Sequence, residues 1–308
     1  MNEQCVIINA VVFVEIGLRR KVLMPKVAIV TDSGAYIPPE LYRDYPVYIV
    51  PFQLVWGDRT FLDGVDIQLE DFYSRLETSE IFPSTSQPPP STFMDLYNEL
   101  LQQGYEVLSI QTSSKLSGTY SSAVQASKML AGAPIEVVDS KTTAMEMGFH
   151  VLAAARAAAN GAALLECKAI AEKARSHTGV YFVVSTLDFL HRGGRIGGAA
   201  AFVGNALQLK PILHVQNGRV EAVDRVRTMQ KAVERMVQIV GKRISKSSHV
   251  RIAALYANEP QRAANLLEQT MQAYDPKTII EAFCAGVSPV VGTHTGPAGV
   301  GLAFMADM

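Results

Sequence analysis

Short β-branched runs alternate with amphipathic segments along most of the chain, starting near residue 27. Strand-like runs occupy Val27–Val30, Glu106–Gln111 and Ile135–Val138. Apolar residues between and after these runs recur at the spacing of a helix face, and the alanine-rich segment from Ala144 to Ala159 is long enough for four turns. Strands that alternate with helices in this way predict a parallel sheet covered by helices.

The segment between the strand-like runs Val27–Val30 and Glu106–Gln111 is less regular. Val47–Val55 reads as one further strand, and the apolar residues from Leu69 to Leu76 have helical spacing. The segment Pro83–Pro90 is rich in proline and hydroxyl groups, so we expect a loop there rather than the interior of a strand.

The second half of the chain mixes two kinds of connection. Asn217-Gly218 separates two strand-like runs, which predicts a hairpin with a type I′ turn. A strand from Val180 to Val184, further strand–helix units, a loop at Gly292–Pro297 and a last strand at Val300–Phe304 complete the pattern. We therefore predict an α/β protein of two domains, with a parallel sheet in residues 24–178 and a mixed sheet in residues 179–308.

The first 23 residues do not fit this alternation. Val6–Ile16 is apolar, and three basic residues follow it at positions 19–21. A secretory signal peptide carries its positive charge before the apolar run, and a run of this length cannot span a bilayer. We expect translation to start at Met24 and residues 1–23 to be a non-native extension; a peripheral anchoring helix is the alternative.

Composition narrows the class of protein. The chain has 308 residues, 48% of them hydrophobic and 19% charged, which is sufficient for two ordinary domains. The net charge of −1 argues against a broad nucleic-acid-binding surface, because such surfaces need a basic excess. Cys5, Cys167 and Cys284 lack the spacing of a zinc site or a disulfide framework, which indicates the reducing cytoplasm.

Two hydroxyl-rich loops carry the most distinctive chemistry in the sequence. One runs from Pro83 to Pro88 and the other from Thr112 to Tyr120, and each precedes a predicted helix. Hydroxyls and backbone N–H groups at helix N-termini can bind an anion without a full positive charge. Either loop taken alone could serve only as a helix cap, but together at one sheet edge the two loops would form an anion clamp.

The other polar motifs are weaker. Asp32 at the end of the first strand is best explained as a cap of the next turn. Gly193-Gly194-Arg195 could approach a phosphate or could be a simple turn, and it matches neither a P-loop nor a dinucleotide-binding fingerprint. No base lies near Thr85 or Ser117 in the sequence, so a nucleophilic mechanism is not indicated.

Several motifs in a fixed order resemble the DegV family of bacterial fatty-acid-binding proteins, from about Lys26 to the C-terminus. The matching segments are Val30-Thr31-Asp32-Ser33, Thr85-Ser86-Gln87-Pro88, Ser113–Tyr120, Val138-Asp139-Ser140, Gly193-Gly194-Arg195-Ile196, Lys210-Pro211-Ile212-Leu213, Arg225-Val226-Arg227-Thr228 and Gly292-Thr293-His294.

The resemblance implies a long-chain fatty acid such as palmitate buried between two α/β domains, with its carboxylate held by Thr85 and Ser117. A supporting head-group network would include Ser86, Ser114, Gly118, Thr119 and His294. The resemblance further implies a non-catalytic subunit of a fatty-acid kinase, needing no metal or other cofactor. A separate kinase protein would phosphorylate the bound acid, and the arginines implied in docking it are Arg192, Arg195, Arg225 and Arg227.

The sequence therefore favours a cytoplasmic lipid-binding protein of lipid metabolism, with no integral membrane segment. Two other functions remain open at this point. One is a phosphotransferase or hydrolase that uses the hydroxyl loops to bind a small anionic substrate. The other is a regulatory protein in which the lipid is only structural.

Overall fold

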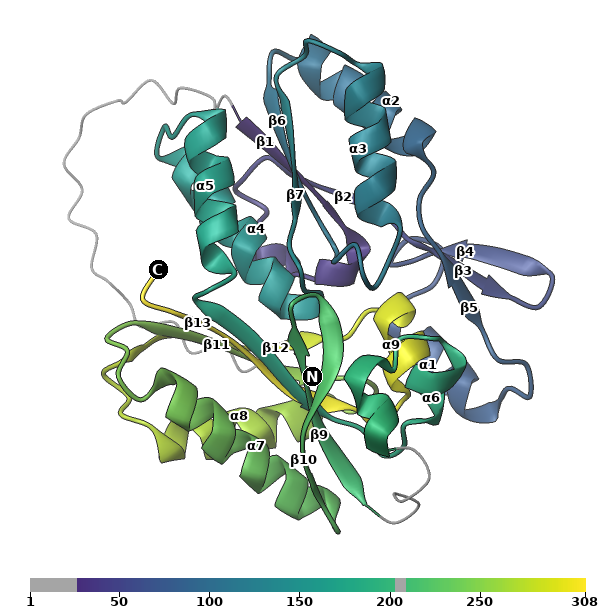
Figure 1. Cartoon of the computed structure of the whole chain (residues 1–308), viewed down its shortest axis with the longest axis vertical. Coiled ribbons are helices and arrows are strands. Elements are labelled where there is room, and N and C mark those ends of the chain that lie inside the picture. The colour runs from purple at the N-terminus through teal and green to yellow at the C-terminus, as the bar shows by residue number, and fades with distance from the viewer. Residues whose placement is uncertain (1–26, 203–208) are drawn as a thin grey trace.

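The computed structural model describes residues 27–202 and 209–308, and its strands form three sheets (Figure 1). The predicted α/β class is confirmed, with a parallel N-terminal sheet and a mixed C-terminal sheet. The expected start at Met24 and the extension 1–23 lie outside the described residues. A short 3-10 helix occupies Gly197–Phe202, where the first described range ends.

The N-terminal sheet is wholly parallel, with the strand order β2-β1-β6-β7. Alternate residues of β1 enter different cores: Val27 and Ile29 pack towards α4 and α5, whereas Ala28 and Val30 pack with α2 and α3. Helices therefore cover both faces. The elements are β1 (Val27–Asp32), β2 (Val47–Val50), β6 (Glu106–Gln111), β7 (Ile135–Asp139), α2 (Pro90–Gln102), α3 (Thr119–Met129), α4 (Ala144–Ala159) and α5 (Leu164–Ala174).

The C-terminal sheet has the order β10-β9-β8-β13-β11-β12, and only β11 and β12 are parallel neighbours. The predicted hairpin is confirmed, because Asn217 and Gly218 have φ values of 50° and 84° as a type I′ turn requires. The elements are β8 (Thr178–Val183), β9 (Lys210–Gln216), β10 (Arg219–Val226), β11 (Val250–Tyr256), β12 (Ile279–Gly286), β13 (Val300–Ala306), α7 (Met229–Ile244) and α8 (Pro260–Ala273).

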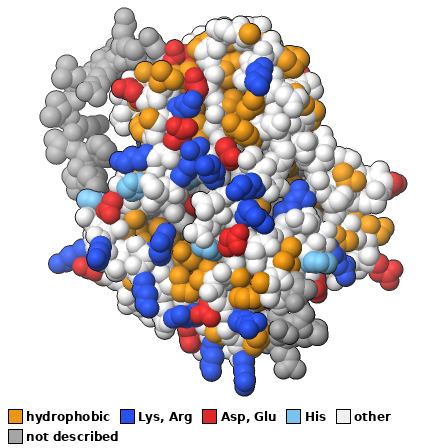
Figure 2. All heavy atoms as spheres, in the orientation of Figure 1, with side chains coloured by type: hydrophobic (Ala, Val, Ile, Leu, Met, Phe, Trp, Pro, Cys, Tyr) orange, Lys and Arg blue, Asp and Glu red, His pale blue; other side chains and the backbone are white. Residues whose placement is uncertain are grey.

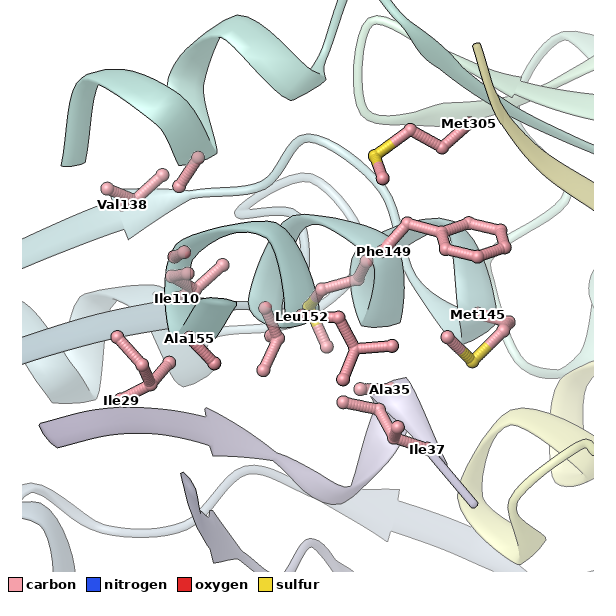
Figure 3. Close-up of a cluster of buried hydrophobic side chains, with 14 of the residues drawn as sticks. Ile29, Ala35, Ile37, Ile110, Val138, Met145, Phe149, Leu152, Ala155 and Met305 are labelled. Carbon is pink, nitrogen blue, oxygen red and sulfur yellow. The ribbon is translucent and has the colours of Figure 1, made fainter. Parts of the chain in front are cut away.

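Helix α4 lies between the two larger sheets and joins their cores (Figures 1 and 3). Met145 and Phe149 on α4 belong to one buried cluster that includes Ile29 and Ile110 of the parallel sheet and Met305 of β13. The domain boundary expected at residues 178 and 179 falls on the first residues of β8. One continuous core therefore crosses α4 and joins the two halves of the chain.

The third sheet is small and was not predicted. The expected strand Val47–Val55 is two strands in different sheets, because Pro51 cannot donate to a ladder and interrupts it. The expected loop Pro83–Pro90 contains an edge strand, to which its flanking prolines do not belong. The elements of this unit are β3 (Gln53–Trp56), β4 (Arg59–Leu62), β5 (Ser84–Ser86) and α1 (Leu69–Thr78).

Two short helices of the C-terminal half pack beside this unit, α6 (Asp188–Arg192) and α9 (Pro289–Thr295). The predicted loop at Gly292–Pro297 is therefore wrong in its first part, since α9 continues to Thr295 and ends at Gly296, whose φ is 80°. Tyr73 of α1 donates a hydrogen bond to the carbonyl of Val287 at 3.0 Å, and Gly292 lets α9 approach the Tyr73 ring.

Candidate ligand-binding site

A cavity of about 1020 Å³, part of it open to solvent, lies where the C-terminal sheet meets the two hydroxyl-rich loops. Its apolar lining comes mainly from the C-terminal half: Val180, Phe182, Leu190, Val215, Val220, Leu255, Ala257, Val287, Val290, Val291 and Val300. Its polar lining comes largely from residues 85–143, joined by three C-terminal residues: Thr85, Ser86, Gln87, Thr112, Ser117, Thr143, Arg195, His294 and Thr295. An apolar cavity with a few polar groups is the usual form of a site for a small, largely apolar molecule.

Thr85 and His294 meet at this cavity although 209 positions separate them in the sequence. Thr85 Oγ1 lies 3.0 Å from His294 Nε2. Pairing of Thr85 with Leu54 fixes β5 in the small sheet, and that sheet packs with α1 against α9, which carries His294 near its end. The expectation that His294 approaches the hydroxyl loops from the second domain therefore agrees with its position.

The His294 ring is neutral at physiological pH. Burial lowers its pKa to about 4, and the positive charge of Arg195 acts in the same direction. Its Nδ1 atom is buried without a hydrogen-bond partner. The sequence showed no base near Thr85, and the structure places an imidazole beside it; yet no carboxylate orients that imidazole, as a nucleophile–base pair would require.

Ser117 lies on the other loop, just before α3. Its hydroxyl oxygen is 2.8 Å from that of Thr119 and accepts a hydrogen bond from the Thr119 N–H at 3.3 Å. The loops themselves touch, because a Cβ at Gly118 would stand 2.7 Å from the side-chain amide of Gln87. The two loops therefore face each other as expected, but Thr85 belongs to the small sheet and not to a neighbouring strand end of the parallel sheet.

The remaining residues of the expected head-group network divide into two groups. Ser86 lines the cavity with Thr85, Ser117 and His294. Ser114 instead donates to Asp139 Oδ2 at 2.6 Å and is not among the lining residues, and neither are Gly118 and Thr119. These last two act on the site through Ser117 and the adjoining loop.

The four candidate docking arginines also differ in their surroundings. Arg195 is half-buried, lines the cavity and donates to the carbonyls of Leu116 at 3.0 Å and Gly193 at 2.6 Å, so it ties the glycine-rich loop to the Ser117 loop. The other three, Arg192, Arg225 and Arg227, are exposed. The Arg192 guanidinium lies over the Phe82 ring and that of Arg225 over the Phe202 ring.

Asp32 has the structural role that the sequence favoured. Its carboxylate accepts hydrogen bonds from the Gly34 N–H at 3.0 Å and from both the N–H and the hydroxyl of Thr112 at 2.7 Å. Burial raises its pKa to about 6 despite these donors. Asp32 thereby fixes the start of the Thr112–Tyr120 loop behind the cavity wall.

Four polar lining residues were absent from the predicted site: Gln87, Thr112, Thr143 and Thr295. Gln87 and Thr112 lie in the two hydroxyl-rich loops and Thr295 lies in the segment Gly292–Pro297, so their place in those segments was the available signal. In the described ranges no cluster of side chains has the composition of a metal site, and no helix there is long and apolar enough to cross a membrane.

Comparison with known families decides the relationship. A model of the family described as "Uncharacterised protein, DegV family" matches residues 26–307. This chain belongs to the DegV family. It is 34% identical to Protein DegV of Bacillus subtilis over 280 residues, which are 90% of this chain and 98% of that protein. It is 37% identical over 277 residues to a DegV domain-containing protein of Streptomyces coelicolor, covering 90% and 97%.

Solved DegV structures share the whole fold. A structure of a DegV family protein from Thermus thermophilus, described as fatty acid binding, matches with a TM-score of 0.86 at 33% identity, covering 92% of this chain and 100% of that one. DegV of Bacillus subtilis, described as a fatty acid binding protein, matches with a TM-score of 0.83 at 33% identity, covering 92% and 99%.

Proposed function

We propose that this DegV protein binds a long-chain fatty acid of the palmitate class in the cavity and presents its carboxylate to a separate fatty-acid kinase. The observation that carries the proposal is the cavity itself, which combines an extensive apolar wall with two facing hydroxyl loops. The fatty-acid-binding descriptions of the Thermus and Bacillus relatives support the same ligand.

The tail supplies most of the affinity in this proposal. Each buried methylene contributes ~0.8 kcal/mol, so about fifteen carbons contribute roughly 12 kcal/mol before the costs of ordering. A hydroxyl bonded to a charged carboxylate contributes about 1.5–3 kcal/mol. The apolar wall therefore retains the ligand, while Thr85 and Ser117 set the position of its head group.

A clamp of neutral hydroxyls suits a carboxylate that must later accept a phosphoryl group. A tight ion pair between arginine and that carboxylate would instead compete with the kinase for it. Arg195 lines the cavity, but its guanidinium already donates to two backbone carbonyls. The exposed Arg192, Arg225 and Arg227 are proposed to dock the kinase, with Arg195 at the edge of that surface. Basic side chains form a band across the face shown in Figure 2, with acidic ones among them.

The protein is proposed to be a cytoplasmic carrier without catalysis or cofactor of its own. The rival hydrolase or phosphotransferase gains one supporting observation, the 3.0 Å contact between the Thr85 hydroxyl and the His294 imidazole. Two observations oppose it: the unpartnered Nδ1 of His294, and the pKa of that ring near 4, which makes it a weak base.

Mass spectrometry of the purified protein under denaturing conditions tests the ligand. A co-purified C14–C18 fatty acid is expected, whereas a phosphorylated metabolite would favour the enzyme. Adding ATP and a bacterial fatty-acid kinase to the loaded protein then tests presentation. Acyl phosphate should form only with both proteins present; lipid that the kinase never phosphorylates would indicate the regulatory protein instead.

A further inference from the structure

We infer that Gly193 fixes the proton of the neutral His294 ring on Nε2, so that Thr85 accepts this proton's hydrogen bond and directs its own hydroxyl proton into the cavity. This assignment rests on the proposed function only for the identity of the ligand. The groups involved belong to the protein and can be observed without any lipid.

Gly193 is required by space and not by backbone conformation. Its φ of −74° and ψ of −7° are open to any residue. A Cβ at this position, however, would stand 2.8 Å from His294 Cε1 and closer still to Nδ1. Only a hydrogen atom fits between the Gly193 Cα and the ring, so this glycine determines where the imidazole can lie.

The same contact distinguishes the two neutral tautomers. With the proton on Nδ1, a buried N–H would point at the Cα hydrogen of Gly193 and would lack an acceptor. With the proton on Nε2, the Nδ1 lone pair faces that C–H group, which is a tolerable contact. Orphaned buried donors are rarer and costlier than under-satisfied acceptors, so the Nε2–H tautomer is favoured.

The tautomer fixes the direction of hydrogen bonding at Thr85. The hydroxyl carries a single proton, and its oxygen accepts from His294 Nε2 across 3.0 Å. The Thr85 proton is then free to donate, and Thr85 lines the cavity. A donor suits an ionised carboxylate. Because Nε2 has no lone pair to offer, His294 cannot deprotonate Thr85, and the pair does not act as a nucleophile with its base.

Nitrogen-15 NMR of the delipidated protein labelled at histidine tests the assignment directly. The His294 signals are identified among the six histidines by their loss in His294→Ala. We expect Nε2 to have the shift of a protonated ring nitrogen and Nδ1 that of an unprotonated one. A proton on Nδ1 would overturn the inference. Since no lipid is present, a failure of fatty-acid binding in a separate assay would be a distinct result.

A thermodynamic cycle tests the part assigned to Gly193. Gly193→Ala should displace the ring, alter the His294 nitrogen shifts and weaken fatty-acid binding several-fold, whereas in the His294→Ala background the same change should cause no further loss. Gly194→Ala is the matched control, because its Cβ would meet nothing within 4 Å although its φ of 70° strains the backbone. If Gly193→Ala lost the same fatty-acid affinity in the wild-type and His294→Ala backgrounds, the effect would belong to the glycine-rich loop and not to the His294 ring. If Gly193→Ala does not fold, the wild-type spectrum still decides the tautomer.

Discussion

Head-group and tail contributions to fatty-acid binding should be separable in this protein. The double variant Thr85→Val and Ser117→Ala removes the two hydroxyls proposed to bind the carboxylate and leaves the apolar wall intact. Neither side chain lies in a buried core cluster, and the three-residue strand β5 pairs through its backbone, so the fold should persist.

The expected loss follows from the two hydrogen bonds to a carboxylate. At about 1.5–3 kcal/mol each, their removal should cost roughly 3–6 kcal/mol. Since 1.4 kcal/mol is tenfold in a dissociation constant, the affinity should fall by roughly 10²–10⁴. Each methylene of the tail should still contribute about 0.8 kcal/mol, or about fourfold.

The assay is a chain-length series. Dissociation constants of saturated fatty acids from C10 to C16 are measured for the wild type and the double variant, and their logarithms are plotted against carbon number. Two parallel lines are expected, with the same slope per methylene and a vertical offset of at least two decades. Fatty alcohols of equal length should show a smaller offset, because their hydroxyl carries no charge.

Two results would contradict this division between head-group and tail contributions. Coincident lines would show that the hydroxyls do not bind the head group. A changed slope would show that the substitutions altered the tail cavity and not only its polar end. Ser91→Ala serves as the control, because Ser91 is an exposed hydroxyl on the first turn of α2 and does not line the cavity. Its line should coincide with that of the wild type.

Three further predictions concern other groups. His294→Ala should lower the rate of acyl-phosphate formation more than it weakens binding, because Thr85 remains but loses its orienting partner; kinase rates on fully loaded protein check this. Arg192→Ala should slow the kinase most at low salt and lower the melting temperature only slightly, since it removes one exposed contact with the Phe82 ring. Arg195→Ala should lower that temperature further, since two carbonyls lose their donor. Burial raises the pKa of Glu146 from 4.5 to about 7, so its contribution to stability is lost as pH rises through this window. Urea unfolding should therefore show Glu146→Gln more stable than the wild type by roughly 3 kcal/mol at pH 8, with no such gain near pH 4.

The regular elements with a periodic apolar pattern follow from the amino-acid sequence alone. The predicted bounds of β6 and α4 coincide with those observed, and the Asn217-Gly218 turn has the predicted type. These features follow from local rules: side-chain alternation in strands, the 3.6-residue repeat of helices, and the φ preferences of asparagine and glycine. The order of the motifs was also sufficient to indicate the family.

The assembly of the site depends on long-range packing that the sequence pattern does not reveal. Local periodicity shows that a face is buried but does not identify the distant element that buries it. The three-residue strand β5 is too short to leave a periodic signal, and packing of its sheet and α1 against α9 is what brings Thr85 to His294. The backbone angles of residue 193 would likewise permit any side chain, so they do not explain why glycine is needed there. The need arises because a ring from 101 positions further along the chain occupies the space where a side chain would begin.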